Sequence, residues 1–185
     1  MKRVGWLAGP ALLAGCTTGF NVSLSGVPSA PISEGAVIEL HQAITIPPGS
    51  TRVWFQSGRP APGYDWYEPT CSLEVRTLDQ NVEQTIEAGG FTVRGIQSMR
   101  DQAGLHTSGP QLAAVNVIAA LGGGLGNDGY FRIWKGYHFW LKSAEQPDVL
   151  RMTCKGGYAD EWEARSPSLA EIRSALGEMA SVHLP

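Results

Sequence analysis

Histidine and serine side chains are the first candidates for chemistry in this sequence. The four histidines are His41, His106, His138 and His183. Imidazoles have to converge before they hold a metal ion, and a catalytic base must lie within hydrogen-bond reach of the group that it deprotonates. The sequence contains no H-E-x-x-H, G-x-S-x-G or S-x-x-K motif. We therefore interpret the histidines as hydrogen-bonding or solvated side chains, with a serine–histidine pair formed by the fold as the alternative.

Two further patterns have the residue types of a functional site without its context. Asp160, Glu161 and Glu163 surround Trp162, and paired carboxylates serve glycoside hydrolysis or calcium binding. The spaced ligands of a calcium loop are missing, so we interpret these three carboxylates as part of a solvated turn.

Residues 124–129, GLGNDG, match the dinucleotide pattern G-x-G-x-x-G. Strand-like YFRIW follows where that motif requires a helix, so we expect a glycine loop and no cofactor.

Aromatic residues are the most suggestive candidates for a binding site. They lie in GYDWYEP, between two predicted strands, and on one face of the predicted strand YFRIWKGYHFW, opposite Ile133, Tyr137 and Phe139. Exposed rings beside polar groups can stack on sugars or hold a partner protein. We favour the alternative, in which both strand faces are packed. The candidate ligand or partner contacts are Tyr64, Trp66, Tyr67, Trp134, His138 and Trp140.

The chain begins MKRVGWLAGPALLAGC, which has the order of a secretory signal peptide over residues 1–15. Lys2 and Arg3 precede a short apolar run, and small residues follow it. The run holds about 10 residues, whereas a membrane-spanning helix needs about 20. We therefore expect the segment to be removed and not to serve as a transmembrane anchor.

Leu13-Ala14-Gly15-Cys16 resembles the lipobox of bacterial lipoproteins. The resemblance implies cleavage before Cys16, a thioether from its sulfur to diacylglycerol, and acylation of the new amino terminus with a fatty acid such as palmitate. Two or more acyl chains anchor a protein stably. Thr17 stands where aspartate retains lipoproteins of enteric-type bacteria in the inner membrane, so we expect the outer membrane, facing the periplasm. The alternative is an ordinary signal peptide with a cysteine at this position.

The cysteine count agrees with lipidation. Three cysteines are an odd number for an exported protein. Lipidation of Cys16 leaves Cys71 and Cys154 as one pair, and the periplasm is oxidising. Alternation in CSLEVRT and VLRMTC puts both sulfurs on the apolar faces of half-buried strands. We predict a structural disulfide, with two buried thiols or a metal site as the alternatives.

Composition favours one β-rich domain over residues 36–185. Residues 16–35 comprise the lipidated cysteine and a stretch rich in Ser, Thr, Gly and Pro, which is typical of a flexible tether. Charged residues make up only 17% of the chain, and 23 glycines favour a loop-rich β protein. Loss of Lys2 and Arg3 takes the net charge from −3 to −5. Since no basic cluster is present, nucleic acid is a poor partner.

Short alternating apolar segments predict an antiparallel β-sandwich or a partly open barrel. AVIELHQAITI is predicted as one strand, with RVWFQ returning beside it; YFRIWKGYHFWLKS and DVLRMTCK form another pair. One C-terminal amphipathic helix is predicted, with a capping box at Ser168 and Glu171 and an apolar face that continues to Met179. The Gly/Ala-rich apolar segment 106–129 is interpreted as a mobile insertion; a short buried helix, a hairpin arm or an exposed contact loop are the alternatives.

The order of these segments resembles a family of uncharacterised proteobacterial lipoproteins. The likeness covers most of residues 36–100 and 131–177, through VIELHQAITIPPGSTRVWFQ, CSLEVRTL, QTIEAGGFTV, RMTCKGG and LAEIRSALG. The resemblance implies location and fold, and it carries no activity or catalytic residue. We therefore expect an envelope-anchored, non-enzymatic binding or structural module whose partner is an envelope protein or a cell-wall glycan. The alternative is an envelope hydrolase that acts on glycan or peptide.

Overall fold

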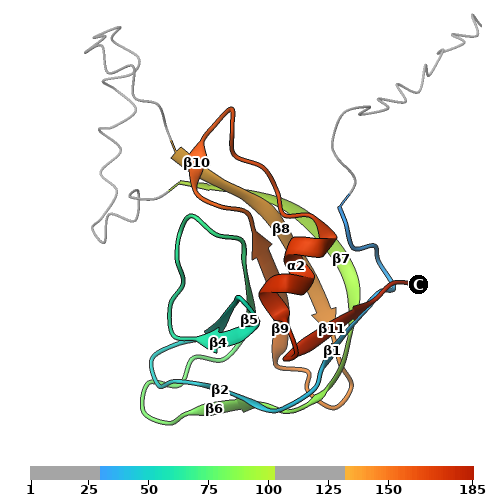
Figure 1. Ribbon diagram of the computed structural model, residues 1–185. Helices are drawn as coiled ribbons and strands as arrows, with labels where there is room; N and C mark the ends of the chain where they lie inside the picture. Colours follow the sequence, from blue (N-terminus) through green and yellow to red (C-terminus); the bar gives the residue numbers. More distant parts are fainter. Residues whose placement is uncertain (1–29, 103–131) are drawn as a thin grey trace, which may run out of the picture.

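The computed structural model describes residues 30–102 and 132–185. Most of their strands form one strongly curled antiparallel sheet, a half-barrel, with a helix against its inner face (Figure 1). The predicted fold class, mainly β with one C-terminal helix, is confirmed, and of the two predicted architectures the partly open barrel is the one found. The predicted signal peptide, Cys16, residues 17–29 and the apolar segment 106–129 lie outside the described residues.

The strands of the large sheet are arranged mostly out of sequence order. Along the chain the elements are β1 (Val37–Leu40), β2 (Ile44–Ile46), β3 (Arg52–Gln56), β4 (Arg59–Ala61), β5 (Thr70–Val75), β6 (Gln84–Ile86), β7 (Gly89–Gln102), β8 (Arg132–Lys142), β9 (Val149–Lys155), β10 (Ala159–Asp160), α2 (Leu169–Leu176) and β11 (Ala180–His183). The sheet order is β11-β1-β7-β8-β9-β5-β3-β4, and β10 pairs with β8. Strands β2 and β6 form a separate small sheet at one end of the half-barrel (Figure 1).

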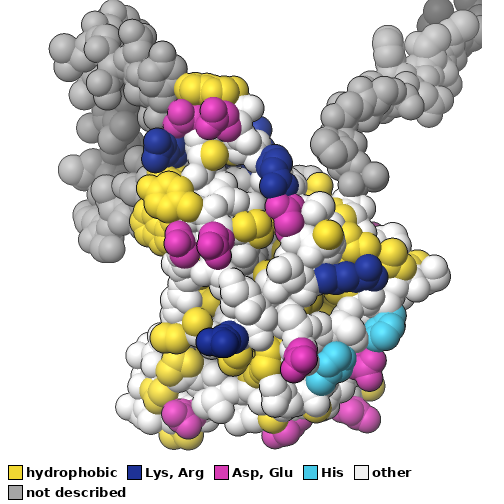
Figure 2. All heavy atoms as spheres, viewed as in Figure 1, with side chains coloured by type: hydrophobic (Ala, Val, Ile, Leu, Met, Phe, Trp, Pro, Cys, Tyr) yellow, Lys and Arg dark blue, Asp and Glu magenta, His cyan; other side chains and the backbone are white. Residues whose placement is uncertain are grey.

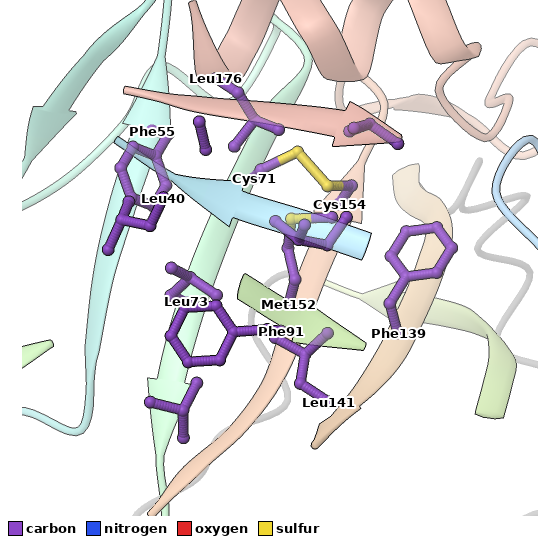
Figure 3. Packing of buried hydrophobic residues seen from close by; sticks show 14 of the residues in the cluster. Leu40, Phe55, Cys71, Leu73, Phe91, Phe139, Leu141, Met152, Cys154 and Leu176 are labelled. Atoms are coloured by element: carbon purple, nitrogen blue, oxygen red, sulfur yellow. A yellow bond between two sulfur atoms is a disulfide. The ribbon is translucent and has the colours of Figure 1, made fainter. Parts of the chain in front are cut away.

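The inner face of the half-barrel and the apolar side of α2 form the core. Along most strands every second residue points inward, as the period of a strand requires, and a bulge between Val93 and Gly95 shifts the alternation in β7. The fully buried strand side chains include Phe55, Leu73, Phe91, Phe139 and Met152, and the helix adds Ile172, Ala175 and Leu176 (Figure 3). Each such large side chain contributes roughly 1.5–3 kcal/mol through burial. The helix therefore fills the space that a second sheet fills in a sandwich.

Helix α2 begins as its local sequence predicts. The Ser168 hydroxyl accepts from the Glu171 backbone N–H, and the Glu171 carboxylate accepts from the Ser168 N–H, so the predicted capping box is present. A bidentate ion pair with Arg165 lowers the pKa of the Glu171 carboxyl to about 2. No helix in the described ranges has the length and apolar character needed to cross a membrane.

The helix ends earlier than its apolar periodicity predicts. Gly177 takes a positive φ of 56°, and its backbone lies against Gly58 so closely that a Cβ there would be 2.3 Å from the Gly58 Cα. The Gly58 N–H donates to the Ala175 carbonyl at 3.1 Å, which ties the β3–β4 turn to the end of the helix. The predicted helical continuation to Met179 is therefore wrong, and Ala180–His183 form strand β11 instead.

Two predicted strand arrangements are also wrong. The segment predicted as one strand is divided into β1 and β2, which belong to different sheets, and β3 pairs with β4 and β5 and not with either of them. All the expected apolar residues of this segment are nevertheless in the core. The predicted alternation of buried and exposed side chains in this segment is therefore correct. The pairing of its backbone is not, because the strands that pair with it lie far away in the sequence. The predicted pairing of β8 with β9 is confirmed.

The predicted disulfide joins Cys71 on β5 to Cys154 on β9. The two residues lie directly opposite each other in the antiparallel ladder, with Cα atoms 4.0 Å apart. Both are buried in the core (Figure 3). The bond links strands that are neighbours in the sheet and 83 residues apart in the sequence.

Candidate functional site

The face of the large sheet turned away from α2, called the outer face, carries polar and aromatic side chains in cross-strand rows. One row holds Arg52, Glu74, Arg151 and Trp140, and the next holds Trp54, Ser72, Thr153 and His138. Beside them Lys155 lies opposite Thr70 on β5 and Gly136 on β8. The same alternation that sends Cys154 into the core therefore sends its neighbour Lys155 to this face.

Six rings gather at one end of the outer face, and we call them the aromatic cluster. They are Trp54, Tyr64, Trp66, Tyr67, Trp134 and Tyr158. Neighbouring ring centroids lie 4.2 to 6.5 Å apart, the range in which aromatic pairs attract each other. Three of the rings come from the loop between β4 and β5, and the others come from β3, β8 and the segment after β9.

Backbone contacts hold the β4–β5 loop against the sheet. The Trp66 carbonyl accepts both the Trp134 indole N–H at 3.1 Å and the Tyr158 N–H at 2.7 Å. Gly157 permits this approach, because a Cβ there would lie 2.3 Å from the Tyr67 carbonyl oxygen. The loop thus presents its rings from a fixed position.

The aromatic cluster has a buried base and an exposed rim. Trp134 is only 4% exposed, whereas Trp66 is 48% and Tyr67 is 64% exposed. Large exposed rings next to each other are unusual on a protein surface and mark contact sites. Trp134 is the member of this cluster that comes from β8, and it is packed, as expected for a strand buried on both faces. The element that covers it is the β4–β5 loop and not a second sheet.

Four of the six predicted contact residues meet in the aromatic cluster, and the other two lie further along β8. His138 Nδ1 is hydrogen-bonded to the Thr153 hydroxyl at 2.8 Å, and burial together with the nearby Arg151 charge lowers the pKa of the imidazole. Two guanidinium groups, those of Arg94 and Arg151, lie 6.0 and 5.3 Å from the ring centroid of Trp140. The outer face therefore changes from aromatic to cationic along the sheet.

Lys155 is the centre of the aromatic cluster and was not predicted as a site residue. Its ammonium lies 4.0 Å from the Trp134 ring centroid, 4.2 Å from that of Tyr64 and 5.1 Å from that of Trp54, and it donates to the Tyr64 hydroxyl. The residue is 5% exposed, and burial lowers the pKa of its ammonium to about 8, although the Asp101 charge acts in the opposite direction. A lysine at the end of a strand is usually solvated, so its type did not indicate a buried site residue. The one available signal was the alternation with Cys154, which places Lys155 on the opposite face of the sheet.

A cleft of about 340 Å³ opens on the outer face beside Lys155. Its cations are Arg52, Arg100, Arg151 and Lys155, and Asp101 is the carboxylate in its wall. Outside the lining residues, Glu74 binds Arg52 at 3.1 Å and Arg151 at 2.7 Å, and Glu161 binds Arg100 at 2.6 Å. Four cations thus face three carboxylates in a chain whose net charge is −3. The cleft is a positive site on a negative protein.

A second polar cluster lies on β1 and β11. The Ser181 hydroxyl is 2.9 Å from Nε2 of both His41 and His183, and His183 Nε2 is also 2.9 Å from a Glu39 oxygen. His41 Nδ1 lies 2.9 Å from the Glu178 carbonyl, which can only accept, so Nδ1 is the donor of this hydrogen bond; in the neutral imidazole Nε2 then accepts from Ser181. Figure 2 shows histidines beside acidic side chains at this edge. The fold therefore forms the serine–histidine pair that the sequence left open.

The remaining predicted patterns do not form a site in the described part of the chain. Asp160 pairs with Arg132 and Glu161 with Arg100, so these carboxylates are engaged in ion pairs. Within residues 30–102 and 132–185, no three His, Cys, Asp or Glu side chains are grouped to hold a metal ion. His106 and the glycine pattern 124–129 lie outside the described residues.

The described residues define a class of architecture: an antiparallel half-barrel around one helix, with an aromatic and cationic site on its outer face. Comparisons with family models, with curated proteins and with solved structures find no match to this chain. The resemblance to a family of lipoproteins therefore stays a prediction, and function has to be argued from the site itself.

Proposed function

We propose that this protein is a lipid-anchored protein of the bacterial outer membrane that faces the periplasm and binds a cell-wall saccharide without converting it. The observation that carries the proposal is the aromatic cluster, whose exposed Trp66 and Tyr67 stand on a fixed loop and whose Trp54 lines the cleft. The C–H faces of sugar rings stack on aromatic rings, and rings already held in place lose little entropy on binding. The lipobox and the buried disulfide support the envelope location.

The dimensions of the site favour a saccharide over a protein partner. A stable protein interface covers about 800 Å² on each partner, whereas small-molecule clefts span roughly 300–1,000 Å³. The cleft of about 340 Å³ belongs to the second class. Its wall also offers a hydroxyl on Thr153 and a carboxylate on Asp101, which can hydrogen-bond to sugar hydroxyl groups.

Binding to cell-wall material tests this proposal. We expect the full-length protein in detergent to sediment with purified peptidoglycan sacculi, and Trp66→Ala to weaken the binding about tenfold, because one stacking ring is lost. Leu78→Ala is the matched control, since Leu78 is 47% exposed and Trp66 is 48% exposed. No sedimentation of the wild type, or equal sedimentation of the two variants, would contradict the proposal.

A hydrolase is the second candidate, because Ser181 and His41 have the contact of a nucleophile and its base. Both histidines of that cluster are exposed to solvent, which weakens the electrostatic stabilisation on which such catalysis depends. In the sedimentation experiment we expect no soluble fragments to be released from the sacculi. Release that disappears in Ser181→Ala would establish the hydrolase instead.

Lipidation of Cys16 has its own test. We expect cells grown with labelled palmitate to label the wild-type protein and not Cys16→Ala, since the acyl-glycerol is carried by that sulfur. The Cys71→Ala/Cys154→Ala double variant serves as the control and should keep its label, because both of those sulfurs are in the disulfide. Label on Cys16→Ala, or none on the wild type, would exclude the lipoprotein assignment.

A further inference from the structure

We infer that the outer-face cleft binds the anionic group of a saccharide, a carboxylate or a phosphate, with Lys155 as its counter-ion. This inference rests on the proposed function and specifies the chemical class of the ligand. It is carried by three features of the described residues: a buried cation without a carboxylate partner, a surplus of cations around it, and an aromatic wall beside it.

The unpaired cation is the first feature. In the described part of the chain Lys155 forms no ion pair, and its hydrogen-bond partner is the neutral Tyr64 hydroxyl. A charge that is removed from water is costly unless it is paired. The three rings around the ammonium supply cation–π attraction, which offsets part of this cost without neutralising the charge. An anion in the cleft would complete the pairing.

The surrounding charges are the second feature. Arg52 and Arg151 share a single carboxylate, Glu74. With Asp101 in the wall and Glu161 paired to Arg100, the four cations of the site exceed its three carboxylates by one charge. Arg52 and Arg151 both line the same cleft as Lys155. Planar guanidinium groups bind carboxylate and phosphate through two parallel hydrogen bonds. The cleft therefore offers one buried ammonium and two guanidinium groups to the same ligand.

A buried hydroxyl adds to this arrangement. Ser72 lies between Trp54 and Thr153 in the cross-strand row, is completely buried, and its Oγ finds no hydrogen-bond partner among the described residues. Buried polar groups almost always have a partner. Ser72 does not itself line the cleft, so its unsatisfied hydroxyl is a buried polar group between two of the cleft residues.

The aromatic wall is the third feature, and it indicates that a ring carries the anion. Trp54 lines the cleft and also belongs to the aromatic cluster, so the cationic and aromatic surfaces are continuous. Gly136 lets β8 approach Lys155, because a Cβ there would lie 2.8 Å from the Lys155 Cα. A sugar with an acidic substituent can therefore stack its ring on aromatic side chains while its charge lies against Lys155.

Matched sugars test the inference on the full-length protein in detergent by calorimetric titration. N-acetylmuramic acid differs from N-acetylglucosamine by a lactyl carboxylate, and N-acetylglucosamine 1-phosphate differs from it by a phosphate. We expect at least one of the two acidic sugars to bind tenfold or more tightly than the neutral one. The arm that binds more tightly identifies which anion the cleft prefers.

Variants separate the anion site from the aromatic surface. Lys155→Met keeps the apolar stem and removes the charge, so it should abolish the preference for the acidic sugar over the neutral one. Lys142→Met, an exposed lysine on β8, is the control and should change neither. If acidic and neutral sugars bind equally and both need Trp66, the inference is overturned while the proposed function stands. If no saccharide binds, the proposed function fails as well.

The wild type provides a readout that does not depend on a variant folding. Since the Lys155 ammonium titrates at about pH 8, the preference for the acidic sugar should fall between pH 7 and pH 9.5. The titratable and charged groups that face it from the other strands and the β4–β5 loop are Arg52, Glu74, Arg100, Asp101, Arg151, His138 and Tyr64. Burial raises the pKa of Tyr64 above 10.0 and lowers that of His138 below 6.5, so neither changes charge in this interval. A preference that is independent of pH over this interval would contradict the role of Lys155.

Discussion

Replacement of Cys71 and Cys154 together with alanine is expected to lower the free energy of unfolding by roughly 4 to 5 kcal/mol. The disulfide closes a loop between residues 83 apart, so its removal returns a large amount of chain entropy to the unfolded state. It also joins β5 to β9 in the middle of the large sheet, where both sulfurs are buried. Denaturant unfolding of the full-length protein, followed by tryptophan fluorescence, measures the change.

Reduction separates the effect of the bond from the effect of the side chains. Wild-type protein unfolded with a reductant should approach the stability of the double variant, and the double variant itself should not respond to the reductant. A difference that persists between reduced wild type and variant measures lost packing of the two sulfurs. Equal stability of the oxidised wild type and the double variant would show that the bond contributes nothing, and free thiols at both positions in non-reducing mass spectrometry would show that it is absent.

The stability of the fold is also expected to depend on pH through Lys155. The pKa of its ammonium is about 8 in the fold and 10.5 when unperturbed. Between these values the unfolded state binds more protons, so the free energy of unfolding rises with pH. The penalty is fully present below pH 8 and amounts to roughly 3 kcal/mol at 1.36 kcal/mol for each pKa unit. It is lost as the pH rises to about 10.5.

Lys155→Met should remove this dependence. The free energy of unfolding of the variant, measured relative to the wild type, is expected to fall by roughly 3 kcal/mol between pH 7 and pH 10.5. The lost hydrogen bond to Tyr64 changes the absolute stability but adds little to this difference between two pH values. The exposed Lys142→Met is the matched control and should show no such trend. An equal trend in both variants would mean that Lys155 is solvated like Lys142.

The alternation of residues within strands could be predicted from the sequence, because it depends on neighbours two positions apart. CSLEVRT and VLRMTC placed Cys71 and Cys154 on apolar faces, and the structure has both in the core. The capping box at Ser168 and Glu171 is equally local and was predicted correctly. In these places the chemical signal and the structure that it specifies lie within a few residues.

Strand pairing could not be predicted in the same way. The sheet places β1 between β7 and β11, although β1 and β11 lie near opposite ends of the described chain, and it places β3 beside β4 and β5. The apolar period that predicted a helix to Met179 also fits a helix followed by a short strand. Pairing of β11 with β1 gave the backbone of Ala180–His183 a better set of hydrogen bonds than a further helical turn next to Gly177.

The candidate site was predicted in four of its six rings, without Trp54 and Tyr158, and was missed in its ionic part. Tyr64, Trp66 and Trp134 were found because exposed or paired aromatics are conspicuous in a sequence. Lys155 was missed because its unusual state depends on its neighbours, which come from β3, β8 and the β4–β5 loop. Burial and the proximity of charges are properties of the assembled sheet.

The sequence by itself thus determined the alternating strands, the disulfide partners and the start of the helix, since each follows from side-chain type and short-range spacing. It also supplied the predicted lipid attachment at Cys16, which stays a prediction. Only the tertiary structure decided that the sheet curls around α2, that six rings from four segments form one cluster, and that an ammonium is buried among them. The physical reason is that side-chain period is a local property, whereas burial, pairing and electrostatic environment are set by residues distant in the chain.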